Sequence, residues 1–338
     1  MFKNSCESVV LTVDSGLVLD TMMPNKPAKL RERPRPTRVA VQKALLSWFK
    51  YEGRQLPWRS TSDHYSIMVS EVMLQQTQVD RVIPIYHSFL HRFPTFDHLA
   101  DASTADVIRS WSGMGYNRRA LNLQRASKRV VEQYNGILPD NLTALQDLPG
   151  VGEYTAAALS CFALGNQVAV VDTNVRRVLG RIFYGPKGAP NKEISDTAKQ
   201  VLPIGEAWNW NQALMDLGAT ICSSRRPTCP LCPVRSNCRS SKAFMEPKGI
   251  LAESHAPYKK KREKFEDSTR YYRGRIVAQL RGLSEGDSCS LDILGSGIKP
   301  NYTTDDESWL LMLLNGLQHD GLVVLSGNES NITVALPS

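Results

Sequence analysis

Leu148-Pro149-Gly150-Val151-Gly152-Glu153-Tyr154, followed shortly by Val170-Val171-Asp172, is the stretch that best indicates the fold. Pro149 stops one helix, and Gly150 and Gly152 supply backbone conformations that residues with a Cβ reach poorly. The pattern predicts a tight hairpin between two helices. Its amides, at the N-terminus of the second helix, can bind phosphate oxygens, since the helix dipole also favours an anion. An ordinary glycine-rich turn is the alternative.

Four of the seven cysteines lie close together, in the pattern Cys222-x6-Cys229-x2-Cys232-x5-Cys238. Such crowding predicts a metal site. Structural zinc sites usually group cysteines in two close pairs, and only Cys229 and Cys232 have that spacing, so the pattern favours a [4Fe-4S] cluster over zinc. Disulfides are a further alternative, for which no secretory context is present.

Positive charge surrounds the cysteines, and the whole chain is basic. Arg225, Arg226, Arg235 and Arg239 lie between or after the predicted ligands. The chain of 338 residues has a net charge of +8 and a pI near 9.1, which favours a polyanionic partner. No apolar run approaches the roughly 20 residues that a membrane-spanning helix needs. The sequence therefore predicts a phosphate-facing surface and no membrane span.

Helical periodicity dominates the sequence, and strand patterns are nearly absent before residue 240. Pro or Gly separates most of the predicted helices. These are Val39 to Tyr51, Ile67 to Thr77, Ile83 to His91, Thr104 to Trp111, Arg118 to Gln133, Leu142 to Leu148 and Tyr154 to Leu164. Residues 1–36 are predicted to be a flexible arm.

The last hundred residues have a different pattern. A basic linker at residues 241–267 contains Lys259-Lys260-Lys261-Arg262. Helices are expected at Arg270 to Leu283 and Asp306 to His319, followed by a hairpin around Ser326-Gly327-Asn328. Helix, helix and hairpin predict a small winged-helix-like unit at residues 268–338. DNA binding and stabilisation of the preceding helices are both open as its role.

The hairpin and the cysteine pattern, in this order, resemble the endonuclease III superfamily of DNA glycosylases, from about Leu45 to Ser240. Within it the chain is most similar to the MutY-type adenine DNA glycosylases. This closer resemblance rests on Leu56-Pro57-Trp58-Arg59, Ser70-Glu71-Val72-Met73-Leu74-Gln75-Gln76-Thr77-Gln78-Val79, Gly113-Met114-Gly115-Tyr116 and Met215-Asp216-Leu217-Gly218-Ala219.

The resemblance implies a mainly α, two-lobed helix-hairpin-helix glycosylase fold with an iron-sulfur cluster loop. A six-helix barrel would span residues 61–178, and a cluster lobe would combine residues 37–60 with residues 179–240. Double-stranded DNA with A·8-oxoguanine or A·G mispairs is the implied partner. A monomer in the bacterial cytoplasm, associated with the nucleoid and followed by an AP endonuclease, is also implied.

Excision of adenine needs a neutral acid against the base and an ionised carboxylate beside the cationic sugar. Glu71 lies in an apolar run, where burial would raise its pKa, although a solvated helix residue is the alternative. Asp172 could simply cap a helix. By resemblance, Glu71 protonates the adenine, Asp172 stabilises the sugar, and Asn174 holds the carboxylate and water. Thr173 departs from the commoner Asp-Gly-Asn pattern.

Tyr154 occupies the position where bifunctional relatives have the lysine that forms a Schiff base. Without that amine, strand cleavage by β-elimination has no nucleophile, so a monofunctional enzyme is expected. By resemblance, Gln76 and Thr77 contact the orphan base, and Tyr116 stacks into the duplex. Asn117 replaces a frequent second tyrosine.

The roughly one hundred residues after Cys238 contain no match to the Nudix-like domain with which well-known relatives recognise 8-oxoguanine, so the opposite-base preference stays open. Two alternatives to an adenine glycosylase also stay open. One is a thymine glycosylase for G·T mismatches, and the other is a non-catalytic iron-sulfur DNA-binding protein.

Overall fold

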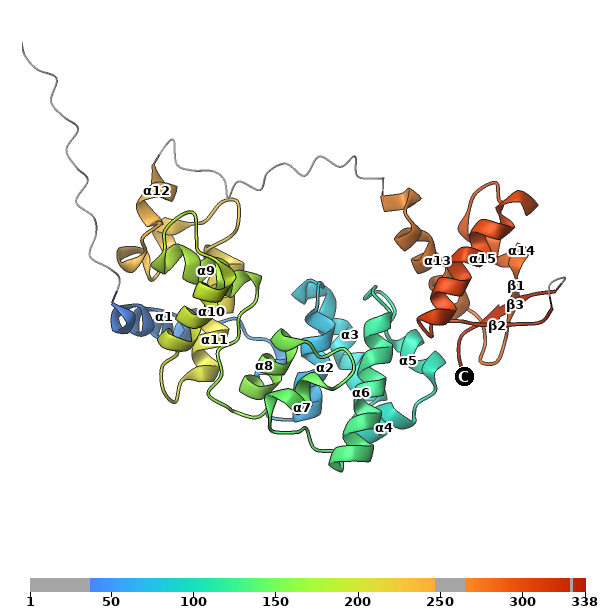
Figure 1. Cartoon of the computed structure of the whole chain (residues 1–338), viewed down its shortest axis with the longest axis horizontal. Helices are drawn as coiled ribbons and strands as arrows, with labels where there is room; N and C mark the ends of the chain where they lie inside the picture. The colour runs from blue at the N-terminus through green and yellow to red at the C-terminus, as the bar shows by residue number, and fades with distance from the viewer. Residues whose placement is uncertain (1–36, 247–264, 329–330) are drawn as a thin grey trace, which may run out of the picture. The chain divides into compact units, whose positions relative to one another are not determined.

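A computed structural model of the chain describes residues 37–246, 265–328 and 331–338, which are mainly helical as predicted (Figure 1). The predicted arm at residues 1–36 and the basic stretch from Lys259 to Arg262 lie outside the described residues. The helices are α1 (Arg38–Glu52), α2 (His64–Leu74), α3 (Val79–Arg92), α4 (Phe96–Asp101), α5 (Thr104–Ser110), α6 (Arg118–Tyr134), α7 (Leu142–Gln146), α8 (Glu153–Phe162), α9 (Thr173–Phe183), α10 (Asn191–Val201), α11 (Ala207–Asp216), α12 (Ser241–Met245), α13 (Thr269–Arg281), α14 (Leu291–Ile298) and α15 (Glu307–His319).

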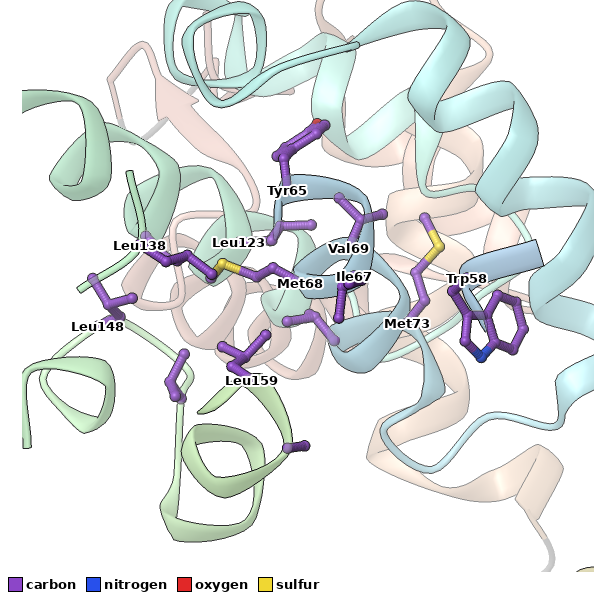
Figure 2. Packing of buried hydrophobic residues seen from close by; sticks show 14 of the residues in the cluster. Trp58, Tyr65, Ile67, Met68, Val69, Met73, Leu123, Leu138, Leu148 and Leu159 are labelled. Atoms are coloured by element: carbon purple, nitrogen blue, oxygen red, sulfur yellow. The ribbon is translucent and has the colours of Figure 1, made fainter. Parts of the chain in front are cut away.

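One hydrophobic core surrounds α2. This helix begins after Asp63, whose carboxylate accepts a hydrogen bond from the Ser66 amide at 2.8 Å. Eight of the eleven residues of α2 are buried, because α3, α6 and α8 pack around it. Figure 2 shows part of this core, with Met68 of α2 among Leu123, Leu138, Leu148 and Leu159. A carboxyl group carried by α2 therefore lies in an apolar environment.

A second core joins segments that are far apart in the sequence. Helix α1 packs against α11, and α9 packs against both α10 and α11 (Figure 1). Val41 and Leu45 of α1 are fully buried in this core with Val178 and Leu214. The predicted division into lobes, with its boundaries, stays a prediction.

The C-terminal unit has a third core and the small sheet that the sequence predicted. Strands β1 (Cys289–Ser290), β2 (Val324–Ser326) and β3 (Thr333–Ala335) form an antiparallel sheet in the order β1-β3-β2. The hairpin is thus present, and β1 and α14 are additions to the prediction. Periodicity missed α14 because glycines interrupt it. A Cβ at Gly295 would lie 2.4 Å from the Tyr302 ring, so close packing requires glycine there.

Strands appear late in the chain, as the sequence predicted. Within the described residues, the first strand is β1, well after residue 240. No helix in these ranges combines the length and the apolarity that a membrane crossing would require.

Candidate active site

Glu71 lies in the middle of α2, and only 7% of its surface is exposed. The pKa of its carboxyl group is raised to about 7, mainly by burial and also by the negative charge of Asp172, while Arg59 and a hydrogen bond with Tyr154 act in the opposite direction. Glu71 is therefore not a solvated helix residue. At neutral pH a large fraction of its carboxyl groups carries a proton.

Tyr154 stands in the first turn of α8 and connects the hairpin to this acid. Burial, with the nearby Glu71 and Asp172, raises the pKa of its phenol well above the usual value. The hydroxyl consequently stays protonated and can donate to Glu71. Tyr154 also packs against the barrel core, so its packing and polar roles coexist.

Both carboxylate oxygens of Asp172 are held by hydrogen bonds. The Val175 amide donates to Oδ1 at 2.6 Å, which caps α9, and the Asn174 side-chain amide donates to Oδ2 at 3.0 Å. The capping role and a role in the site are thus compatible. Thr173 takes the first position of α9 without disturbing this cap.

Arg177 was not singled out from the sequence, although it follows Asn174 by three residues on α9. It donates to Asn174 Oδ1 and to the Gly218 carbonyl, both at 2.8 Å, and its Nε donates to the Cys222 carbonyl at 2.8 Å. A Cβ on Gly218 would lie 2.7 Å from the Cβ of Asn174. The backbone of the cysteine loop is therefore connected to the Asp172 carboxylate through two side chains.

Two segments that carried the family resemblance meet in one buried ion-pair network. Asp216 accepts two hydrogen bonds from the Arg59 guanidinium, at 2.8 and 2.9 Å, and two from Arg54. The Asp216 side chain is completely buried, and its two arginines lower the pKa of its carboxyl group. Arg59 is thereby held where its charge opposes the protonation of Glu71.

The four predicted ligands Cys222, Cys229, Cys232 and Cys238 line a single cavity, beside Arg181. The six described cysteines are free thiols, so none of them forms a disulfide. Within the ranges that the structure describes, no group of three His, Cys, Asp or Glu side chains converges on one point as a single metal ion requires. The four thiols nevertheless lie around one shared cavity.

The cysteine loop also offers positive charge to its surroundings. Arg225 and Arg226 are both exposed between the first two cysteines. Arg181 instead points inward, where it donates to the Cys222 sulfur at 3.4 Å and to the carbonyls of Ser223 and Ser224. The loop therefore has an inner arginine that holds it and outer arginines available to an anion.

One side of the predicted hairpin is buried, and the other side is exposed to solvent. Gly150 has a φ of +80°, and a Cβ there would lie 2.8 Å from the Asn122 Cβ. The side chains of Leu148 and Val151 are buried, so these residues can face DNA only through their backbone. Gly152 caps α8, and no atom lies within 4 Å of a Cβ built on it. The space at Gly152 leaves the first amides of α8 accessible to a phosphate group.

Gln76 and Thr77 lie in a turn, whereas the sequence predicted a helix through Thr77. Helix α2 ends at Leu74, and Gln76 has a φ of +56°. Tyr116, in the loop before α6, also has a positive φ, of +46°. Residues other than glycine adopt this conformation at an energetic cost, and such strain is concentrated at functional sites.

Arg119 holds these two strained segments together and was also missed by the sequence analysis. Its guanidinium donates to the carbonyls of Val72, Met73 and Gln75, to Thr77 Oγ1 at 3.0 Å, and to the carbonyls of Met114 and Gly115. Its charge also lies over the Tyr116 ring, 5.6 Å from the centroid. Because Arg119 binds the carbonyl groups at the end of α2, the helix ends at Leu74 and the turn beside Tyr116 is held in place.

Comparison with known proteins identifies the family that the chain matches. Residues 69–203 match the model of the HhH-GPD superfamily base excision DNA repair proteins. The "Adenine DNA glycosylase" of Mycolicibacterium smegmatis is 39% identical over 240 residues, which cover 70% of this chain and 79% of that protein. The "Adenine DNA glycosylase" of Mycobacterium tuberculosis strain H37Rv is 45% identical over 196 residues, 56% of this chain and 64% of that protein.

A solved structure agrees with the sequence relatives on the fold. A thermostable thymine-DNA glycosylase is 32% identical, with a TM-score of 0.57, over 61% of this chain and 96% of that chain. The buried acid on α2, the hairpin and the capped aspartate all lie within residues 69–203, the range that matches the family model. The chain belongs to the adenine DNA glycosylases of the HhH-GPD superfamily of base excision DNA repair proteins.

Proposed function

We propose that the protein hydrolyses the N-glycosidic bond of adenine mispaired with 8-oxoguanine or guanine in double-stranded DNA. The observation that carries the proposal is the buried Glu71, whose pKa of about 7 leaves a proton available, beside the hydrogen-bonded Asp172. The Gln75-Gln76-Thr77-Gln78 run and the similarity to adenine DNA glycosylases argue against a thymine glycosylase. A DNA-binding protein without activity would lose stability by burying Glu71 and gain nothing.

In the proposed reaction, Glu71 donates its proton to a ring nitrogen of the flipped adenine. The bond between the sugar C1′ and adenine N9 then breaks, and its electron pair leaves with the base. Asp172 stabilises the positive charge that develops on the sugar, while Asn174 and Tyr154 hold the two carboxyl groups. Water adds to C1′ and loses a proton, which completes the hydrolysis.

The product is an abasic site in an intact strand, because Tyr154 offers no amine for a Schiff base. An endonuclease that cuts at abasic sites must act next. Gln76, Thr77 and Tyr116 take the place of the extruded adenine and contact its partner base. Their fixed, strained backbone supports that role, since a rigid wedge loses little entropy on binding.

Cys222, Cys229, Cys232 and Cys238 are proposed to hold a [4Fe-4S] cluster. Bound there, the cluster would supply structural cross-linking of the loop. Arg225 and Arg226 would then face the DNA phosphates, and Arg177 would transmit the position of the loop to Asn174. Iron and acid-labile sulfide in the purified protein, at about four each per chain, are expected; zinc would contradict the proposal.

The decisive experiment measures single-turnover excision on duplexes that differ only in one pair: A·8-oxoguanine, A·G, A·C and T·G. Wild-type protein should release adenine, with strand breaks only after alkali. Glu71→Gln should abolish excision, because the protons of an amide are not acidic enough to be transferred to the base, while binding of the mismatch persists. Excision of thymine, retained turnover by Glu71→Gln, or breaks without alkali would each contradict part of the proposal.

A further inference from the structure

The structure contains a groove beside Gln76, Thr77 and Tyr116, the residues proposed to contact the partner base. It has a volume of about 850 Å³ and lies between the barrel and the C-terminal unit. The turn at Gln75 to Gln78 and the Tyr116 loop form one wall, and Phe265, Arg270 and Tyr271 contribute to the other. The side chains of the proposed catalytic site are not part of its lining. The groove is thus lined by Gln76, Thr77 and Tyr116, here called the wedge residues, and not by the catalytic carboxyl groups.

Arg270 of α13 directly contacts Tyr116, one of the wedge residues. Its Nη1 donates to the Tyr116 hydroxyl at 3.1 Å, and its guanidinium lies over the Tyr116 and Phe265 rings, 5.8 and 5.0 Å from their centroids. Among the described side chains, no carboxylate forms an ion pair with Arg270. Arg273 and Arg118, which also line the groove, both pair with Asp320. Arg270 therefore offers an uncompensated positive charge at the groove wall.

The C-terminal unit packs against the barrel beside the loop that carries Tyr116. Arg281 donates to the Ile108 carbonyl at 2.9 Å and to the Asn117 side chain at 2.7 Å. Ile108 and Leu121 of the barrel belong to the same buried cluster as the core of the C-terminal unit. Asn117, which departs from the family pattern, therefore ties the Tyr116 loop to α13. Arg270 is presented to the groove by a packed interface rather than by a loose appendage.

We propose that this groove binds the DNA strand that carries the partner base of the excised adenine, with Arg270 on a phosphate of that strand. Arginine stacked with aromatic rings is a typical surface for a nucleic-acid backbone with an unpaired base. The choice of strand follows from the lining of the groove, which includes Gln76 and Tyr116, proposed to contact the partner base, and does not include Glu71. This assignment of strands rests on the proposed function. The C-terminal unit then takes part in recognising the opposite strand without being a Nudix-like domain.

The test replaces Arg270 in the full-length protein and measures DNA affinity against salt. Arg270→Gln should weaken binding of an A·8-oxoguanine duplex by about tenfold, and should reduce the slope of log K against log salt by about 0.9, the value for one lost phosphate contact. Arg275→Gln is the matched control. Arg275 lies on the same helix, but it donates to the Gly297 carbonyl at 2.7 Å and does not line the groove. An unchanged slope for Arg270→Gln would overturn the proposal.

Neutral methylphosphonates identify the strand. Placed one at a time on the strand opposite the adenine, they should weaken wild-type binding at one or two positions and leave Arg270→Gln unaffected there. The same pattern on the adenine strand would overturn the assignment. Because Glu71→Gln can serve as the background for all binding measurements, the result does not depend on excision. Failure of adenine release by wild-type protein would instead count against the proposed function alone.

Discussion

At the scale of single residues, the two carboxyl groups of the site, on Glu71 and Asp172, lie in different surroundings. Glu71 is enclosed by apolar side chains of α2 and its neighbours, and burial dominates its protonation. Asp172 stands at a helix N-terminus, where two N–H groups donate to its oxygens. A neutral donor and a hydrogen-bonded carboxylate can thus lie close to each other, as hydrolysis of an N-glycosidic bond requires.

The pKa of Glu71 predicts the pH dependence of excision. The protonated form is active and persists up to about pH 7, so the single-turnover rate should fall as pH rises above that value. The hydrogen bond from Tyr154 lowers the pKa of Glu71, so Tyr154→Phe should move this decline to higher pH. Rates measured from pH 5 to 9 under saturating protein test both statements. A rate that increases through pH 7 would be incompatible with Glu71 as the acid.

At the scale of elements, the hairpin depends on two glycines for different reasons. Gly150→Ala places a Cβ at positive φ and 2.8 Å from the Asn122 Cβ, and should cost at least about 1–2 kcal/mol of unfolding free energy. Gly152→Ala meets no neighbouring atom and should leave stability unchanged. It should weaken DNA binding, because its methyl group stands where a phosphate approaches the α8 amides. Thermal melts and fluorescence anisotropy on both variants measure the two effects.

The pair of glycine variants serves as its own control. If both variants lost stability equally, the contrast in their surroundings would have no consequence. If Gly152→Ala bound DNA as tightly as wild type, the α8 amides would not be a phosphate site.

The observed helix boundaries show which of them the sequence periodicity predicted and which it did not. Periodicity located α1, α5, α6 and α8 to within two residues at each end. It extended α2 to Thr77, because nothing in that sequence shows that Arg119 binds the carbonyls at its end. It missed α4, whose six residues are too few to establish a period.

At the scale of the whole molecule, Asp216 joins the segment before α2 to the end of α11. Asp216→Asn leaves Arg54 and Arg59 beside a neutral partner and should cost about 3–5 kcal/mol, as broken buried pairs do. The pKa of Asp216 is lowered in the folded protein, so its stabilisation is present above the unfolded pKa and is lost as pH falls. Urea unfolding should therefore show a deficit at pH 7 that shrinks in acid.

Asp106→Asn is a suitable control for that measurement. Asp106 pairs with Arg92 at 2.9 Å, but both side chains are partly exposed, so the loss should stay below about 1 kcal/mol. Equal losses for the two variants would mean that burial of the Asp216 network contributes little.

The sequence by itself determined the features that local chemistry decides. These are the cysteine spacing, the glycines of the hairpin and the aspartate at a helix start, each of which is a local pattern in the sequence. The role of Tyr154 came from the family resemblance instead. Tertiary structure alone decided which surroundings those groups meet. The proton on Glu71, the link from Cys222 through Arg177, and the groove between Arg270 and Tyr116 depend on contacts between residues far apart in the chain. Such contacts set burial and charge, and no local pattern encodes them.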